Sequence, residues 1–187
     1  MGWLGKLFNA TPKAELNGIR MDTTRPFWEV EGRTTFAVLL RALGDFLPDG
    51  SVLYFEDGSP DRKLLDFLNA HAIEEQTHVA VATLWPRPVY YHVPATPQNL
   101  AELAVLAESH AEPELAVHFH AYRDGKVLLQ WHDAFGQPML LDGGTPEEQV
   151  RPFAEALGMT FKLNTETVEQ DAPQIFPEGR GRPSGKS

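Results

Sequence analysis

The sequence predicts a single α/β (α+β) domain with a mixed β-sheet and helices packed mainly on one face. A unit of short strand, small-residue turn, Ser/Thr-Pro and amphipathic helix occurs three times, in residues 51–73, 88–111 and 138–158. Residues 115–133 show a β-hairpin pattern around Asp124-Gly125. A chain of 187 residues is long enough for one full core and short for two.

Composition divides the chain into three parts. Residues 1–33 mix short apolar and polar stretches, so we expect an irregular segment that docks on the core. Residues 34–163 alternate apolar runs with turn signals and form the predicted domain. Residues 164–187 end in a Gly/Pro/Ser-rich basic tail, which we expect to be disordered.

The elements of the domain can be placed in order. A helix is predicted over 35–46, where apolar residues fall at helical spacing. In the repeated unit, Ser59, Thr96 and Thr145 are predicted helix N-caps, each followed by a proline suited to the first helical position. Strands should follow the helices, at about 78–83, 115–122 and 160–163. Strand–helix–strand units of this length predict parallel crossovers, to which the hairpin adds an antiparallel pair.

Charge and composition exclude several classes of protein. The formal net charge of -10 disfavours a nucleic-acid binder, which needs clustered Lys and Arg. The chain has no cysteine, so disulfides, thiol catalysis and Cys-ligated zinc are excluded. It contains no apolar run of about 20 residues, so we expect no integral membrane association. With no secretory signal pattern at the N-terminus, a cytoplasmic location is the expectation.

The hairpin carries the sharpest chemical signal, because His118 and His120 stand two residues apart on a strand and point to one side. A two-residue type I′ loop at Asp124-Gly125 places His132 on the opposite face. A three-residue loop with a bulge at Gly125 shifts the pairing by one residue and brings His132 beside the other two. Three convergent histidines could then hold a divalent metal with an open fourth position.

Three carboxylates could support such a site. Asp133 follows His132 directly, and Glu56 and Asp57 lie at the end of a predicted strand, where ligands tend to bind in open sheets. They are candidates to orient metal ligands or to act as acid and base. Asp57-Gly58 also fits an ordinary turn, which needs no functional explanation.

Polar-aromatic side chains suggest a different use of the sheet. Read with a period of two residues, seven of them fall on one broad face, and Tyr, Trp and His are residues that protein interfaces favour. An alternative is that helices or the N-terminal segment cover this face. The predicted interaction face, also called the polar-aromatic face below, consists of Tyr54, Tyr90, His92, His118, His120, Tyr122 and Trp131.

These observations favour a non-catalytic interaction or regulatory module that uses this face to bind a protein partner or a second copy of itself. Its acidity would favour a basic partner, and this interpretation requires no cofactor. A second hypothesis is a metal-dependent hydrolase or lyase with His118, His120 and His132 as ligands. A third is a small-molecule-binding protein with a pocket beyond the strand ends.

Overall fold

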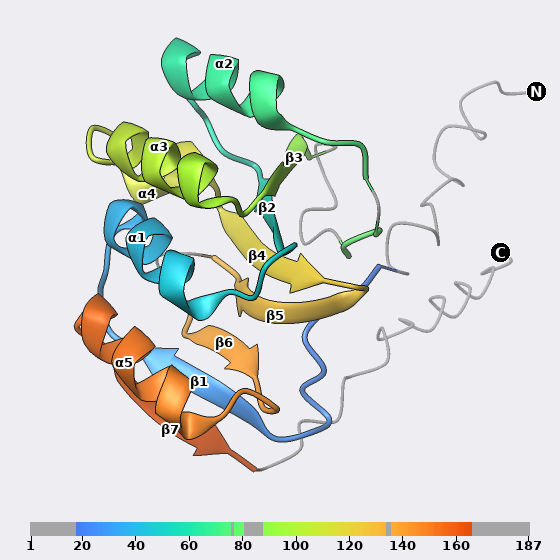
Figure 1. Cartoon of the computed structure of the whole chain (residues 1–187), viewed down its shortest axis with the longest axis vertical. Helices are drawn as coiled ribbons and strands as arrows, with labels where there is room; N and C mark the ends of the chain where they lie inside the picture. The colour runs from blue at the N-terminus through green and yellow to red at the C-terminus, as the bar shows by residue number, and fades with distance from the viewer. Residues whose placement is uncertain (1–17, 76, 81–87, 134–135, 166–187) are drawn as a thin grey trace, which may run out of the picture.

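The computed structural model describes residues 18–75, 77–80, 88–133 and 136–165, in which one seven-stranded sheet carries its helices on one side (Figure 1). The predicted single α+β domain with helices on one face is confirmed. The strands are β1 (Phe27–Glu31), β2 (Val52–Glu56), β3 (Tyr90–Pro94), β4 (His118–Arg123), β5 (Lys126–Trp131), β6 (Met139–Asp142) and β7 (Thr160–Asn164). The helices are α1 (Phe36–Phe46), α2 (Arg62–His71), α3 (Pro97–Ala107), α4 (Glu112–Leu115) and α5 (Glu147–Leu157).

The strand order β3-β2-β4-β5-β6-β1-β7 makes every neighbouring pair of named strands antiparallel. The predicted mixed sheet is therefore antiparallel throughout its described strands. Strands β3 and β4 are connected through α3 and run in the same direction, but β2 lies between them. In the same way β6 and β7, connected through α5, flank β1. The crossovers do join parallel strands, and an earlier strand is inserted within each of them.

Strand β1 lies within residues 1–33, which were predicted to be irregular. That prediction was wrong for residues 27–31, which belong to the sheet. Trp28 packs toward the helices, whereas Glu29 and Glu31 face the other side and both pair with Lys162 of β7. Apolar and polar residues do alternate from Trp28 to Glu31, but the strand has only five residues and so gives a short signal. The remaining N-terminal prediction, for residues 1–17, and the tail beyond residue 165 lie outside the described residues.

One of the three predicted N-caps, Thr96, is confirmed. Thr35 caps α1 and Thr96 caps α3, each accepting a hydrogen bond from the backbone N–H three residues later. Helix α2 begins two residues later than predicted, with Asp61 rather than Ser59 as its cap. Helix α5 has no side-chain cap, so Thr145 does not serve as one.

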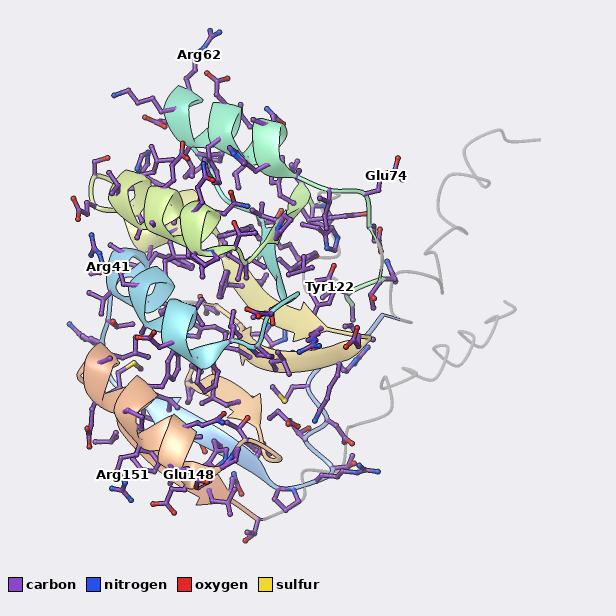
Figure 2. All side chains as sticks on the ribbon, viewed as in Figure 1. Arg41, Arg62, Glu74, Tyr122, Glu148 and Arg151 are labelled. Carbon is purple, nitrogen blue, oxygen red and sulfur yellow. The ribbon has the colours of Figure 1, made fainter. Side chains whose placement is uncertain are left out.

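The main core fills the space between the sheet and the helices. Helix α1 lies in the middle of the helical layer and packs against α3 and α5 (Figure 1). Its Leu39, Leu40 and Leu43 are fully buried against the central strands. Charged side chains such as Arg62 and Arg151 project outward from the helices (Figure 2). Among the described residues, no helix has the length and apolar character needed to cross a membrane.

The strand predicted at 78–83 is not found over its described part. Val79 forms only an isolated parallel bridge with Ile19, and residues 81–83 lie outside the described residues. This bridge joins two short segments that lie against the helix-free face of the sheet. They are called the covering segments below and comprise residues 18–21 and 73–80, of which residue 76 is not described.

Candidate functional site

The hairpin between β4 and β5 has a register that combines features of both predicted alternatives. Asp124 and Gly125 have φ angles of 49° and 75°, and Arg123 pairs with Lys126, as a two-residue type I′ loop requires. The register then shifts between Tyr122 and Ala121, which pair with Val127 and Leu129. The residue between these two partners is an extra residue of β5, so the bulge lies within the strand and not at the turn.

This bulge turns His132 onto the face that carries His118 and His120. The ring of His132 is 5.2 Å from the ring of His118 and 5.1 Å from that of His120, nearly perpendicular to the latter. The structure therefore brings the three histidines together. The short loop alone would have separated them, and the internal bulge reverses that effect.

His118 and His132 lie in contact beside the backbone of Asp133. His118 accepts at Nδ1 from the backbone N–H of Asp133 at 3.1 Å, and the Nδ1 of His132 lies 3.3 Å from the same nitrogen. An accepting imidazole nitrogen carries no proton, so the Nδ1 of His118 is unprotonated and its lone pair is taken by the Asp133 N–H. Burial, followed by the charges of His118 and Arg20, lowers the pKa of His132 to about 4. His132 is therefore neutral near pH 7.

His120 is the most enclosed member of the cluster. It has no accessible surface, and neither ring nitrogen has a hydrogen-bond partner among the described residues. The ring of Tyr54 lies 5.4 Å away on β2. Desolvation, reinforced by His132 and His118, lowers the pKa of His120 well below its ordinary value.

The predicted metal ligands converge, but not in a metal-binding arrangement. The Asp133 N–H occupies one nitrogen of His118, and that nitrogen cannot accept this bond and bind a metal ion through the same lone pair. Over residues 18–165, excluding those not described, no group of three or more His, Asp or Glu side chains is placed to hold a metal ion.

The accompanying carboxylates are divided between the cluster and the turns. Glu56 is fully buried, pairs across the sheet with His118, and accepts a hydrogen bond from the Tyr54 hydroxyl at 2.7 Å. Burial, followed by the charge of Glu56, raises the pKa of Tyr54, which therefore remains a donor. Asp57 has a left-handed backbone (φ 58°) in the turn toward α2, and Asp133 is exposed beside the cluster.

Six residues of the predicted interaction face share the helix-free side of the sheet, as the register of β3, β2 and β4 requires. Trp131 does not. It packs on Phe36 of α1 with ring centroids 5.6 Å apart, and its indole N–H donates to the carbonyl of Gln137. The assignment of Trp131 to this face was wrong, because the bulge that brings His132 onto it also sends Trp131 into the main core.

The covering segments close much of this face. Ile19 donates to the carbonyl of His78 at 2.7 Å and accepts from the N–H of Ala80 at 3.0 Å. Ile19, Ile73 and Val79 form a second small core with Tyr54 and Tyr122, on the side of the sheet away from the helices (Figure 2). As a result Tyr54, His92, His120 and Tyr122 each expose 3% or less of their surface.

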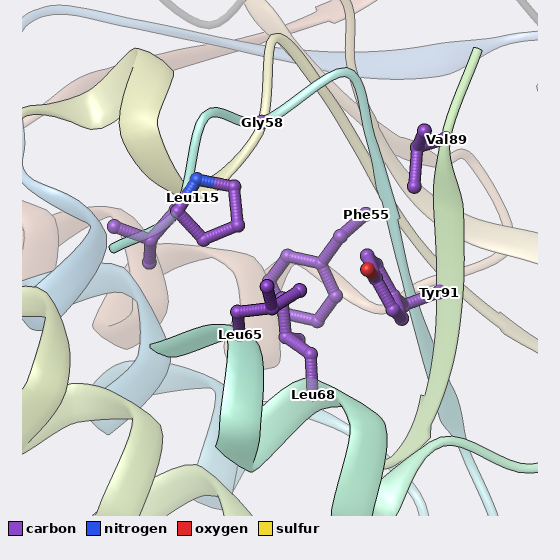
Figure 3. Close-up of a pocket in the computed structure, with 8 residues that line it drawn as sticks. Phe55, Gly58, Leu65, Leu68, Val89, Tyr91 and Leu115 are labelled. Atoms are coloured by element: carbon purple, nitrogen blue, oxygen red, sulfur yellow. The ribbon is translucent and has the colours of Figure 1, made fainter. Parts of the chain in front are cut away.

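An apolar groove of about 260 Å³ lies on the other side of the sheet, between α2 and the ends of β2 and β3 (Figure 3). Val89, at its edge, is 60% exposed, which is unusual for a large apolar side chain. The groove lies beyond a strand end, as the pocket hypothesis placed it, but its residues were not named. Its principal wall residues are Phe55, Leu65, Leu68, Val89, Tyr91 and Leu115.

One sequence signal could have located the groove. Leu65 stands beside Leu64 on α2 and widens the apolar stripe of that helix beyond the residues that the core buries. Leu64 is 1% exposed, whereas Leu65 is only partly buried and lines the groove. When the apolar stripe of a helix is wider than its contact with the core, the additional apolar residues indicate a second apolar contact.

A comparison with known proteins finds no matching family, no matching curated protein and no matching solved structure. The functional argument therefore depends on the residues of this chain.

Proposed function

We propose that this chain is a non-catalytic protein-binding module and that the apolar groove beside α2 receives an anchor side chain of its partner. The size of the groove carries the proposal. A volume of about 260 Å³ falls below the range of about 300–1,000 Å³ typical of small-molecule sites. It exceeds the roughly 150 Å³ of a cavity that accepts benzene. One aromatic or branched aliphatic side chain fits this space, and interfaces place their strongest anchors in such pockets.

The groove is also better placed for a partner than the polar-aromatic face. Four residues of that face are buried beneath the covering segments, so a partner would have to displace part of the chain to reach them. The groove, in contrast, is open beside Val89, and the hydroxyl of Tyr91 adds a hydrogen-bonding group to its apolar lining. A polar group in an otherwise apolar pocket gives orientation to the bound side chain.

Two exposed valines provide a matched test. Val89 lines the groove and is 60% exposed, whereas Val105 on α3 is 63% exposed and does not line it. A random 12-residue peptide library, displayed on phage, is selected on the full chain. We expect enriched peptides to bind the chain and its Val105→Asp variant equally, and to bind Val89→Asp at least tenfold more weakly.

The tenfold loss corresponds to about 1.4 kcal/mol, a modest value for placing a carboxylate beside a buried apolar anchor. Circular dichroism of both variants checks that neither exposed substitution alters the fold. Selection that enriches no peptide, or enriches only peptides that bind Val89→Asp as well as the unchanged chain, contradicts the proposal. Binding of a small aromatic probe without any peptide would instead assign the groove to a small molecule.

A further inference from the structure

We infer that the partner segment carries a lysine or arginine next to its anchor side chain, an inference that rests on the protein-binding function proposed above. The groove has an apolar floor, but the loops that form one end of it are rich in carboxylates. An anchor flanked by positive charge would satisfy both features in one short segment.

Close packing brings the acidic β2–α2 loop and the acidic helix α4 to the same end of the groove. A Cβ atom added at Gly58 would lie 2.3 Å from the carbonyl oxygen of Leu115, so the β2–α2 loop rests directly on the end of α4. Both residues line the groove. The acidic residues adjoining them are Asp57 and Asp61 on the loop, and Glu112 and Glu114 on α4.

Two of these carboxylates are held by the fold. Asp61 accepts from the N–H of Leu64 at 2.9 Å, and this bond is the main reason that its pKa is lowered. Glu114 accepts from the N–H of Ala111 at 2.8 Å. The carboxylates of Asp57 and Glu112 form no hydrogen bond or ion pair with any described residue, and both side chains are only partly buried. They are therefore available to a partner.

The basic residues nearby do not balance this charge. Arg62 and Lys63 begin α2, and Arg62 pairs with Asp66 one turn along, 3.6 Å away. His110 contacts Asp61 at 3.2 Å, and these contacts leave the carboxylates of Asp57 and Glu112 unpaired among the described residues. A second copy of the chain is disfavoured as occupant, because two chains of formal charge -10 repel each other. A basic segment gains from the same charge through steering and local pairing.

The peptides selected in the preceding experiment test this inference directly. Their consensus should contain Lys or Arg within two positions of an apolar residue. Their affinity should fall threefold to tenfold for Asp57→Asn/Glu112→Gln, about the effect of losing two partly exposed ion pairs. Asparagine tolerates the left-handed backbone at position 57. The matched control is Asp49→Asn/Glu155→Gln, which removes two exposed charges elsewhere and should leave affinity within a factor of two.

Each outcome separates the two proposals. Peptides that depend on Val89 but have a neutral or acidic consensus, or that ignore Asp57→Asn/Glu112→Gln, overturn the charge inference and leave the protein-binding function standing. The absence of any Val89-dependent peptide overturns both. Sedimentation of the chain that shows a dimer abolished by Val89→Asp identifies a second copy as the occupant and also overturns the basic-partner inference.

Discussion

At the scale of single residues, His120 combines complete burial with two ring nitrogens that have no partner among the described residues. An unsatisfied buried polar group costs about 1–3 kcal/mol. His92 on β3, on the far side of β2, differs because its Nδ1 contacts the Tyr122 hydroxyl at 2.9 Å, which leaves only its Nε2 without a partner among the described residues. Two similar imidazoles on one face therefore contribute differently to stability.

Replacing His120 with phenylalanine removes both unsatisfied nitrogens and keeps a ring in the cavity. We expect His120→Phe to raise the free energy of unfolding at pH 7.5 by about 1–3 kcal/mol, measured by urea denaturation. His92→Phe is the control and should lower it, since the Tyr122 hydroxyl then loses its partner. A clear destabilisation by His120→Phe would mean that the imidazole binds something in solution, and metal analysis of the purified chain would then test for a bound ion.

The buried histidines also make stability depend on pH. Burial lowers the pKa of His92, His120 and His132 below the ordinary value of 6.5. Below that pH the unfolded chain binds protons that the folded chain does not, so their contribution is complete above 6.5 and is lost as the pH falls. For His132, with a pKa of about 4, the loss amounts to about 2–3 kcal/mol by pH 4.5.

Urea denaturation at pH 7.5 and pH 4.5 measures this loss. His132→Gln should reduce the difference between the two pH values by about 2 kcal/mol, because glutamine does not titrate. Asp49→Asn, at an exposed site remote from the cluster, should leave the difference unchanged. Equal pH dependence in the chain and in His132→Gln would contradict the assigned pKa shift.

At the scale of elements, the features that could be predicted are those that depend only on residues close together in the sequence. Apolar spacing located α1 and α3, and Thr96 marked the start of α3 because an N-cap needs only a side-chain oxygen beside the first turn. Asp124-Gly125 located the turn of the hairpin for the same reason, although the sequence left open whether its loop has two or three residues. The bulge inside β5 had no such marker, since its extra residue, Leu128, is an ordinary strand former.

That single bulge explains both the convergence of the three histidines and the wrong assignment of Trp131 to the polar-aromatic face. A shift of one residue reverses the face of every later side chain in the strand. It brought His132 to His118 and removed Trp131 from the polar-aromatic face. The bulged register buries Trp131 against Phe36 of α1, a contact between residues about a hundred positions apart in the chain. Such long-range packing cannot be inferred from the hairpin sequence.

At the scale of the whole molecule, the two faces of the sheet are closed by different means. Helices α1, α2, α3 and α5 cover one face with a continuous core. The other face is closed over β2, β3 and β4 by the covering segments, whose bridge between Ile19 and Val79 is isolated from the sheet. With far fewer buried apolar contacts than the main core, these segments should open at a lower free energy than the sheet.

Hydrogen exchange tests this difference within one molecule. The amides of Ile19 and Ala80 are bonded only across the isolated bridge, to the carbonyls of His78 and Ile19. We expect them to exchange at least tenfold faster than the amides of Tyr54 and His120 in the central strands, because local opening releases them without unfolding the sheet.

Ile19→Asp should accelerate exchange in both covering segments and leave α1 protected, because a carboxylate cannot be buried beside Tyr54 and Tyr122 without a partner. Val105→Asp introduces the same charge on an exposed helix surface and should change neither region. If Ile19→Asp instead accelerates exchange across α1 and the central strands together, the covering segments unfold only with the domain. In that case the polar-aromatic face stays closed throughout the folded state, and partner binding depends on the groove alone.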